Sequence, residues 1–90
     1  MGYELYPNGN AFLGFYVNGK PEGSGTYLWS NGEVYDGEWV NGMKHGNGQW
    51  MGIKGDSYTG EWKFGKPDGH GIHRWLNGKN LKKTKHYFFE

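Results

Sequence analysis

The sequence lacks cysteine altogether and contains only three prolines among 90 residues. Without cysteine, neither disulfide bonds nor a thiolate metal site can hold the fold together. No apolar run approaches the roughly 20 residues that a transmembrane helix needs, and the N-terminal residues lack the charged and apolar regions of a signal peptide. We therefore expect an intracellular, cytoplasmic protein.

Valine, isoleucine and leucine are also scarce, whereas aromatic residues make up 19% of the chain and glycine accounts for 18 residues. Abundant glycine alone is typical of disordered chains, but such chains are poor in large aromatics. A chain of this length forms one small domain at most, with a marginal core. The composition indicates large rings placed on a glycine-rich backbone.

The net charge of +1 is unevenly distributed. The basic excess lies in residues 79–90, which hold Lys79, Lys82, Lys83 and Lys85 against Glu90, while the rest of the chain is mildly acidic. A nucleic-acid-binding domain normally carries a basic stripe along its whole length. We therefore expect no nucleic-acid partner.

The sequence repeats every 23 residues, from starts at Phe12, Tyr35 and Tyr58. Glycine recurs in five columns of this repeat, and only Gly52 is out of phase once the register is extended to the N-terminus. A repeat of this length indicates stacked supersecondary units. We divide the chain into a partial leading repeat (1–11), three repeats (12–34, 35–57 and 58–80) and a basic, aromatic cap or tail (81–90). The start within a repeat predicts either a natural half-repeat cap or a piece of a longer array.

The alternation within each repeat has a period of two, which indicates β-strands. Tyr35, Gly37 and Trp39 should share one face of a strand, with Asp36 and Glu38 on the other. We expect an all-β fold: a single-layer antiparallel twisted sheet of stacked β-hairpins.

The strongest turn signal, Asn-Gly, occurs after the second strand of a repeat, at Asn31-Gly32 and Asn77-Gly78. We expect type I′ turns there, with Lys54-Gly55 in the equivalent place, and a connecting segment over Gly42 to Gly48 inside the hairpin.

Glycine within a strand costs about 0.5–1 kcal/mol relative to alanine, so its recurrence at Gly37 and Gly60 requires a compensating contact. We expect rings from neighbouring strands to lie over the bare backbone at these positions.

Residues 35–48 and 58–71 resemble MORN (membrane occupation and recognition nexus) repeats, in which Tyr-x-Gly-x-Trp-x-x-Gly is followed by Gly-x-Gly. The first repeat departs conservatively, with Phe12 and Tyr16 in place of the Tyr and Trp. The resemblance covers about residues 2–80 and implies a β-rod without catalytic residues. It further implies binding of a protein partner, with a helix on the aromatic face, or self-association, in cytoskeletal, ciliary or other large assemblies. Lipid binding is also attributed to this family.

Two sets of residues are candidate binding sites. The aromatic set could bind a partner or could simply be the core; it comprises Tyr16, Trp39, Trp62, Tyr27, Trp29, Trp50 and Trp75. The basic set, Lys82, Lys83 and Lys85, could contact an anionic membrane or could protect the last open edge of the sheet.

Other chemistry is disfavoured by the residues present. The Gly-x-Gly segments precede no predicted helix and carry no phosphate-loop Lys-Ser/Thr, and His70 and His73 should face opposite sides of a strand. We therefore expect no catalytic residues, no metal and no cofactor. The preferred function is a non-enzymatic scaffold or adaptor. The alternatives are a phosphoinositide or membrane-surface module and the regulatory array of a larger enzyme such as a phosphatidylinositol-phosphate kinase.

Overall fold

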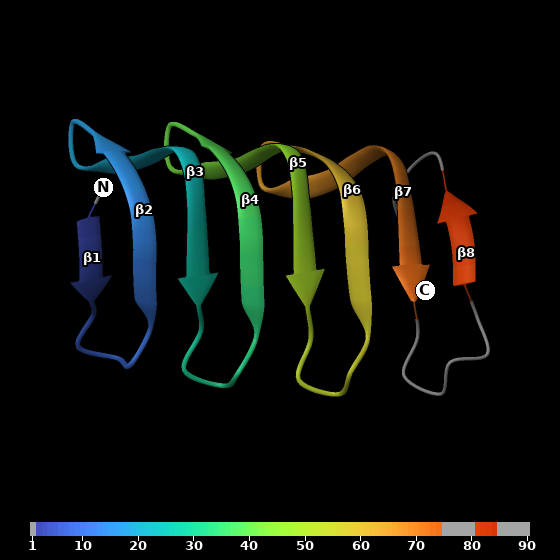
Figure 1. Ribbon diagram of the computed structural model, residues 1–90, viewed down its shortest axis with the longest axis horizontal. Coiled ribbons are helices and arrows are strands. Elements are labelled where there is room, and N and C mark those ends of the chain that lie inside the picture. The colour runs from blue at the N-terminus through green and yellow to red at the C-terminus, as the bar shows by residue number, and fades with distance from the viewer. Residues whose placement is uncertain (1, 75–80, 85–90) are drawn as a thin grey trace.

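The protein forms one antiparallel sheet of eight strands in sequence order. The computed structural model describes residues 2–74 and, by their backbone, residues 81–84. The strands are β1 (Gly2–Leu5), β2 (Ala11–Val17), β3 (Lys20–Leu28), β4 (Val34–Val40), β5 (Met43–Met51), β6 (Ser57–Lys63), β7 (Lys66–Arg74) and β8 (Leu81–Thr84). Figure 1 shows them side by side in a single layer. The predicted fold class is confirmed.

Each repeat contributes one hairpin, and consecutive hairpins join edge to edge. The hairpins are β2–β3, β4–β5 and β6–β7, and the pairs Gly25↔Gly37 and Gly48↔Gly60 join one hairpin to the next. At the C-terminal end β8 pairs with β7, so the sheet continues into the predicted cap or tail. The part of the chain that the structure describes has no helix that could cross a membrane.

The tight turns lie in a different place from the one predicted. Asn18-Gly19, Asn41-Gly42 and Phe64-Gly65 join the two strands of each hairpin, and all six residues have positive φ, as a type I′ turn requires. At Asn31-Gly32 only the glycine has positive φ, and a wider connection over residues 29–33 separates β3 from β4. The predicted type I′ turn at Asn31-Gly32, and its equivalent at Lys54-Gly55, are therefore wrong, while Asn77-Gly78 lies outside the described residues.

The segment from Gly42 to Gly48 is strand rather than connection, because β5 begins at Met43. A register shift between Gly37 and Trp39 marks a β-bulge in this strand pair, with Gly46 at φ +70°. Glu38 fixes the bulge, since its carboxylate oxygen Oε1 accepts the Asn47 N–H at 3.1 Å. Glu61 makes the equivalent bond to the N–H of His70 at 2.9 Å.

The positive φ of Phe64 yields a testable prediction. Asparagine occupies this position in the other two hairpins and adopts a left-handed conformation more readily than phenylalanine. The Phe64 side chain is 64% exposed, so it contributes little to packing. Phe64→Asn is therefore expected to stabilise the fold by about 0.5–1 kcal/mol, measured by urea denaturation. Unchanged or lower stability would show that the Phe64 ring contributes at least as much as its backbone conformation costs.

The hairpin tips also link neighbouring repeats. The N–H of Gly42 donates to the carbonyl of Pro21 at 2.9 Å, and that of Gly65 donates to the carbonyl of Lys44 at 3.0 Å. Figure 1 shows the tips bent toward the N-terminal end, so that the second and third tips lie over the preceding hairpin.

A row of glycines crosses the sheet from β1 to β7 through successive cross-strand pairs. The row consists of Gly2, Gly14, Gly25, Gly37, Gly48, Gly60 and Gly71. Three rings, one from the first strand of each hairpin, cover this row of glycines. Phe12 lies against Gly25, Tyr35 against Gly48 and Tyr58 against Gly71. Rings from the neighbouring strand thus cover Gly25, Gly48 and Gly71, whereas we expected them over Gly37 and Gly60. At those two glycines the nearest atoms to an added Cβ are backbone atoms of the paired strand and the hydroxyl of Tyr35 or Tyr58 from the same strand.

The core is a ladder of rings on this face of the sheet. Phe12, Tyr35 and Tyr58 are fully buried, and Trp39 and Trp62 are nearly so. Each tryptophan bridges two repeats: Trp39 meets Phe12 edge-on at 5.4 Å between ring centroids and Tyr35 at 5.1 Å, and Trp62 meets Tyr35 and Tyr58 in the same way. Edge-to-face pairs at these separations are favourable. The ladder therefore gives a one-layer sheet a continuous core.

Candidate functional site

The aromatic face is the candidate binding site, and it consists of the side chains on the same side as the glycine row. Of the predicted set, Trp39 and Trp62 are core residues, and their indole N–H groups donate to the carbonyls of Gly25 and Gly48 at 3.0 Å. The partly exposed members are Tyr16, Tyr27, Trp29 and Trp50. Trp75 lies outside the described residues. A partner on this face would therefore meet those four rings rather than the buried indoles.

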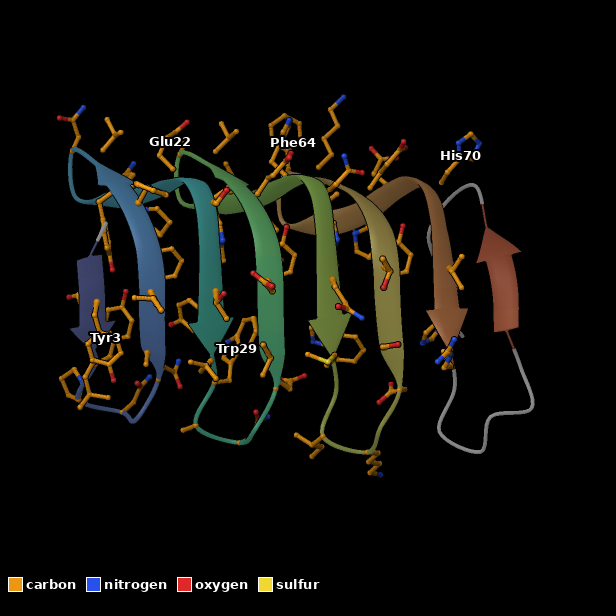
Figure 2. All side chains as sticks on the ribbon, in the orientation of Figure 1. Tyr3, Glu22, Trp29, Phe64 and His70 are labelled. Carbon is orange, nitrogen blue, oxygen red and sulfur yellow. The ribbon has the colours of Figure 1, made fainter. Side chains whose placement is uncertain are left out.

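Tyr27 and Trp29 form a ring pair in the first repeat. Their centroids are 4.7 Å apart, and Tyr6 stacks on Tyr27 from the leading partial repeat at 6.0 Å. The Asn10 amide donates to the Tyr27 hydroxyl at 3.1 Å, which fixes the ring. Figure 2 shows Trp29 at the end of β3, beside the connection to β4. This cluster is held in place on several sides while part of its surface stays open.

In the second repeat Trp50 alone fills the space of that pair. Trp50 stands in the column of Tyr27, and Gly52 stands in the column of Trp29. A Cβ added at Gly52 would lie 2.7 Å from Cη2 of Trp50 and closer still to a carboxylate oxygen of Asp56, so that one of these side chains would have to move. The out-of-phase glycine thus makes room for the larger ring, so its position has a packing reason that the repeat pattern does not reveal.

The tyrosine hydroxyls on this face bond within the chain. Tyr35 donates to the carbonyl of Glu38 at 3.0 Å, and Tyr16 donates to the Glu4 carboxylate at 3.0 Å. Burial raises the pKa of Tyr35 well above its ordinary value, and the negative charge of Glu38 adds to the shift. Both hydroxyls therefore act as structural donors.

Lys44 is a site residue that sequence reasoning missed. Its Nζ lies 5.3 Å from the ring centroid of Trp29, 5.4 Å from that of Trp62 and 5.7 Å from that of Tyr35, within the range of cation–π attraction. Burial lowers the pKa of Lys44, and the negative charge of Glu33 acts in the opposite direction. One signal was present in the sequence, because the other repeats have Pro21 and Pro67 in this column.

The predicted basic set is only partly described. The backbone of Lys82 and Lys83 belongs to β8, where they pair with His73 and Ile72, whereas Lys85 lies outside the described residues. Membrane contact through these lysines stays a prediction.

The opposite face carries exposed apolar side chains that sequence reasoning also missed. Six of them lie on the first repeat and the strand before it: Tyr3, Leu5, Leu13, Phe15, Val17 and Leu28. Val40, Met51 and Ile72 are exposed on the same face of later strands. Later repeats have Asp36 and Glu38, or Thr59 and Glu61, where the first has Leu13 and Phe15. Comparison of the repeats column by column would have revealed this difference. The face farther along is more polar and holds a shallow depression of about 270 Å³, lined by Gln49, Ser57, Thr59, Ile72 and Arg74.

The described residues contain no group of three or more His, Asp or Glu side chains that could hold a metal ion. His70 is exposed and His73 is buried, on the two faces of β7. On the aromatic face, rings surround the ammonium group of Lys44, and this arrangement is suited to binding.

Comparison with protein families gives a match to the MORN repeat over residues 12–34, 35–57 and 58–79. Comparison with curated proteins gives no match. The three matched ranges begin at the fully buried ring of each repeat, Phe12, Tyr35 and Tyr58.

Proposed function

The chain belongs to the MORN repeat family, and on this premise we propose that it is a non-enzymatic scaffold or adaptor that binds a partner protein through its aromatic face. MORN repeats are consistent with a repeat scaffold or binding module. The observation that carries the proposal is the exposed part of the ring cluster: Tyr27, Trp29 and Trp50 pack on the core ladder, yet no second layer of the described residues covers them.

The chemistry of these rings supports a protein partner. Tryptophan and tyrosine are enriched among residues that dominate protein interfaces, because a large rigid ring buries much area at little entropic cost. Tyr27 is already fixed by Asn10 and by the Tyr6 ring, so little further ordering is needed on binding. We propose that the partner belongs to a cytoskeletal, ciliary or other large assembly inside the cell, as the family resemblance implies.

Site-specific photo-crosslinking in cells tests the proposal. A benzophenone amino acid is placed at Trp29 on the aromatic face, at Phe15 on the apolar part of the opposite face, or at Thr59 on its polar part. We expect a discrete protein adduct from position 29 and none from position 59, because Thr59 lies on the face with more polar side chains. The readout is the mass and identity of the adduct.

The three positions also separate the alternatives. Adducts from position 15 alone would place the interface on the opposite face, and adducts of this same chain would identify self-association. The membrane-surface alternative replaces the proposal if two results occur together. Position 29 gives no adduct, and the protein floats with anionic vesicles at low salt only when Lys82, Lys83 and Lys85 are present.

A further inference from the structure

Lys44 places a positive charge among the rings of the aromatic face. Its ammonium group lies within 5.7 Å of three ring centroids, and the side chain is half-buried. These rings come from three different repeats, since Trp29 belongs to the first, Tyr35 to the second and Trp62 to the third. Lys44 therefore marks a point near the middle of the array.

The fold does not require a lysine at this position. In the second repeat Lys44 pairs with Trp39 across the hairpin. Proline occupies the same position in the other two repeats, where Pro21 pairs with Tyr16 and Pro67 pairs with Trp62. The interaction that this position makes with the next hairpin tip uses the backbone carbonyl, and Pro21 and Lys44 both supply it. Neither the strand register nor the contact with the next hairpin tip therefore requires a charged side chain at this position of the central repeat.

The ammonium has no carboxylate within ion-pair distance among residues 2–74. Glu33 acts on it electrostatically, but a Glu33 carboxylate oxygen accepts a hydrogen bond from the Asn31 amide at 3.2 Å. Glu4, the acidic residue that faces the glycine row from β1, accepts the Tyr16 hydroxyl. A half-buried charge gains most from an opposite charge, because the surrounding rings reduce screening by water.

We propose that the aromatic face takes a partner segment that sets an Asp or Glu carboxylate against Lys44 and apolar side chains against the flanking rings. This inference rests on the proposed function and specifies the partner's chemistry. Trp29 and Trp50 offer apolar ring surface on the same face as the ammonium, so one segment can satisfy both. A side-chain carboxylate can reach a cation that lies among rings, whereas the headgroups of a flat bilayer favour lysines at the exposed surface.

A selection with a phage-displayed library of random peptides tests this inference on the full chain. We expect the enriched peptides to share one acidic residue flanked by apolar residues, with affinity measured by fluorescence polarisation. Changing that acidic residue to its amide should weaken binding about tenfold, and Lys44→Met should weaken it equally. The two changes together should weaken binding no further than either alone, since both remove the same ion pair.

Two further variants control for the fold and the charge. Lys44→Pro installs the residue of the other two repeats, so it should fold like the parent chain and lose the same affinity. Lys44→Arg keeps the charge and should retain most of the binding.

Several results would overturn the inference. The inference is contradicted if the enriched peptides contain no carboxylate. It is also contradicted if Lys44→Met reduces the affinity for the acidic peptide and for its amide by the same factor. Such peptides would still support the proposed function if Trp29→Ala weakened their binding. If no peptide is enriched and Lys44→Met instead reduces flotation with phosphatidylserine vesicles, the anion is a lipid and both proposals fail. If no peptide is enriched and flotation is unchanged, the inference fails, and photo-crosslinking from position 29 then decides the proposed function by itself.

Discussion

Alanine at Gly48 is expected to destabilise the fold by about 3 kcal/mol, at the upper end of the range for overpacked cores. A Cβ at this position would lie 2.6 Å from Cε1 of Tyr35 and would overlap the tyrosine hydroxyl. The Tyr35 ring has no room to retreat, since it is fully buried and meets Trp39 and Trp62 at 5.1 Å on two sides. Its hydroxyl would also lose the bond to the carbonyl of Glu38. Urea denaturation followed by tryptophan fluorescence measures the change.

Gly2→Ala is the matched control, because Gly2 occupies the same column of the repeat at the N-terminal edge. The nearest atom to its added Cβ is Cε1 of Tyr16 at 3.4 Å, an ordinary contact. We expect a change below about 0.5 kcal/mol. Equal effects of the two substitutions would show that strand glycine is needed for its backbone freedom and not for ring contact.

Tyr35→Ala is expected to destabilise the fold by about 3–5 kcal/mol, as removal of a large buried ring does elsewhere. Tyr35 is the rung of the ladder that joins the second and third repeats, because both Trp39 and Trp62 pack against it. Small domains have a total stability of about 5–15 kcal/mol, so this loss is a large fraction of it. We expect a much lower urea midpoint, or a chain that is unfolded at 37 °C.

Tyr3→Ala controls for the loss of a tyrosine as such. The Tyr3 side chain is 65% exposed on β1, and its removal should cost less than about 0.5 kcal/mol. A small effect of Tyr35→Ala, similar to that of Tyr3→Ala, would mean that the ring ladder is not the core.

Much of the fold follows from the sequence because the repeat and the alternation are local patterns. The shared face of Tyr35, Gly37 and Trp39 and the edge-to-edge hairpins were predicted and are confirmed. Rings from neighbouring strands were also predicted, but they cover Gly48 and Gly71 rather than Gly37 and Gly60. The position of the tight turn was not predicted correctly, since Asn-Gly occurs both before and after the second strand of the first repeat. Asn18-Gly19 closes a two-residue turn between paired Val17 and Lys20, whereas the Asn31 side chain accepts the Glu33 N–H in a wider loop.

The sequence also could not show which of the aromatic side chains are buried in the core and which are exposed. A period of two places Trp29 and Trp39 on the same face without showing which is buried. Burial depends on cross-strand register: Trp39 lies between Phe12 and Tyr35, while Trp29 follows the end of β3 and has a neighbouring ring on fewer sides. The approach of Lys44 to Trp29 likewise joins different repeats and leaves no local pattern.

A double-mutant cycle between Gly48 and Tyr35 tests most directly the claim that rings seated on the glycine row hold this one-layer sheet together. Leucine at position 35 lacks the Cε1, Cζ and hydroxyl atoms that a methyl group at position 48 would strike. We predict that Gly48→Ala costs about 3 kcal/mol in the parent chain but less than about 1 kcal/mol when it is combined with Tyr35→Leu. The coupling between the two substitutions is then about 2 kcal/mol. An equal cost in both backgrounds would contradict it.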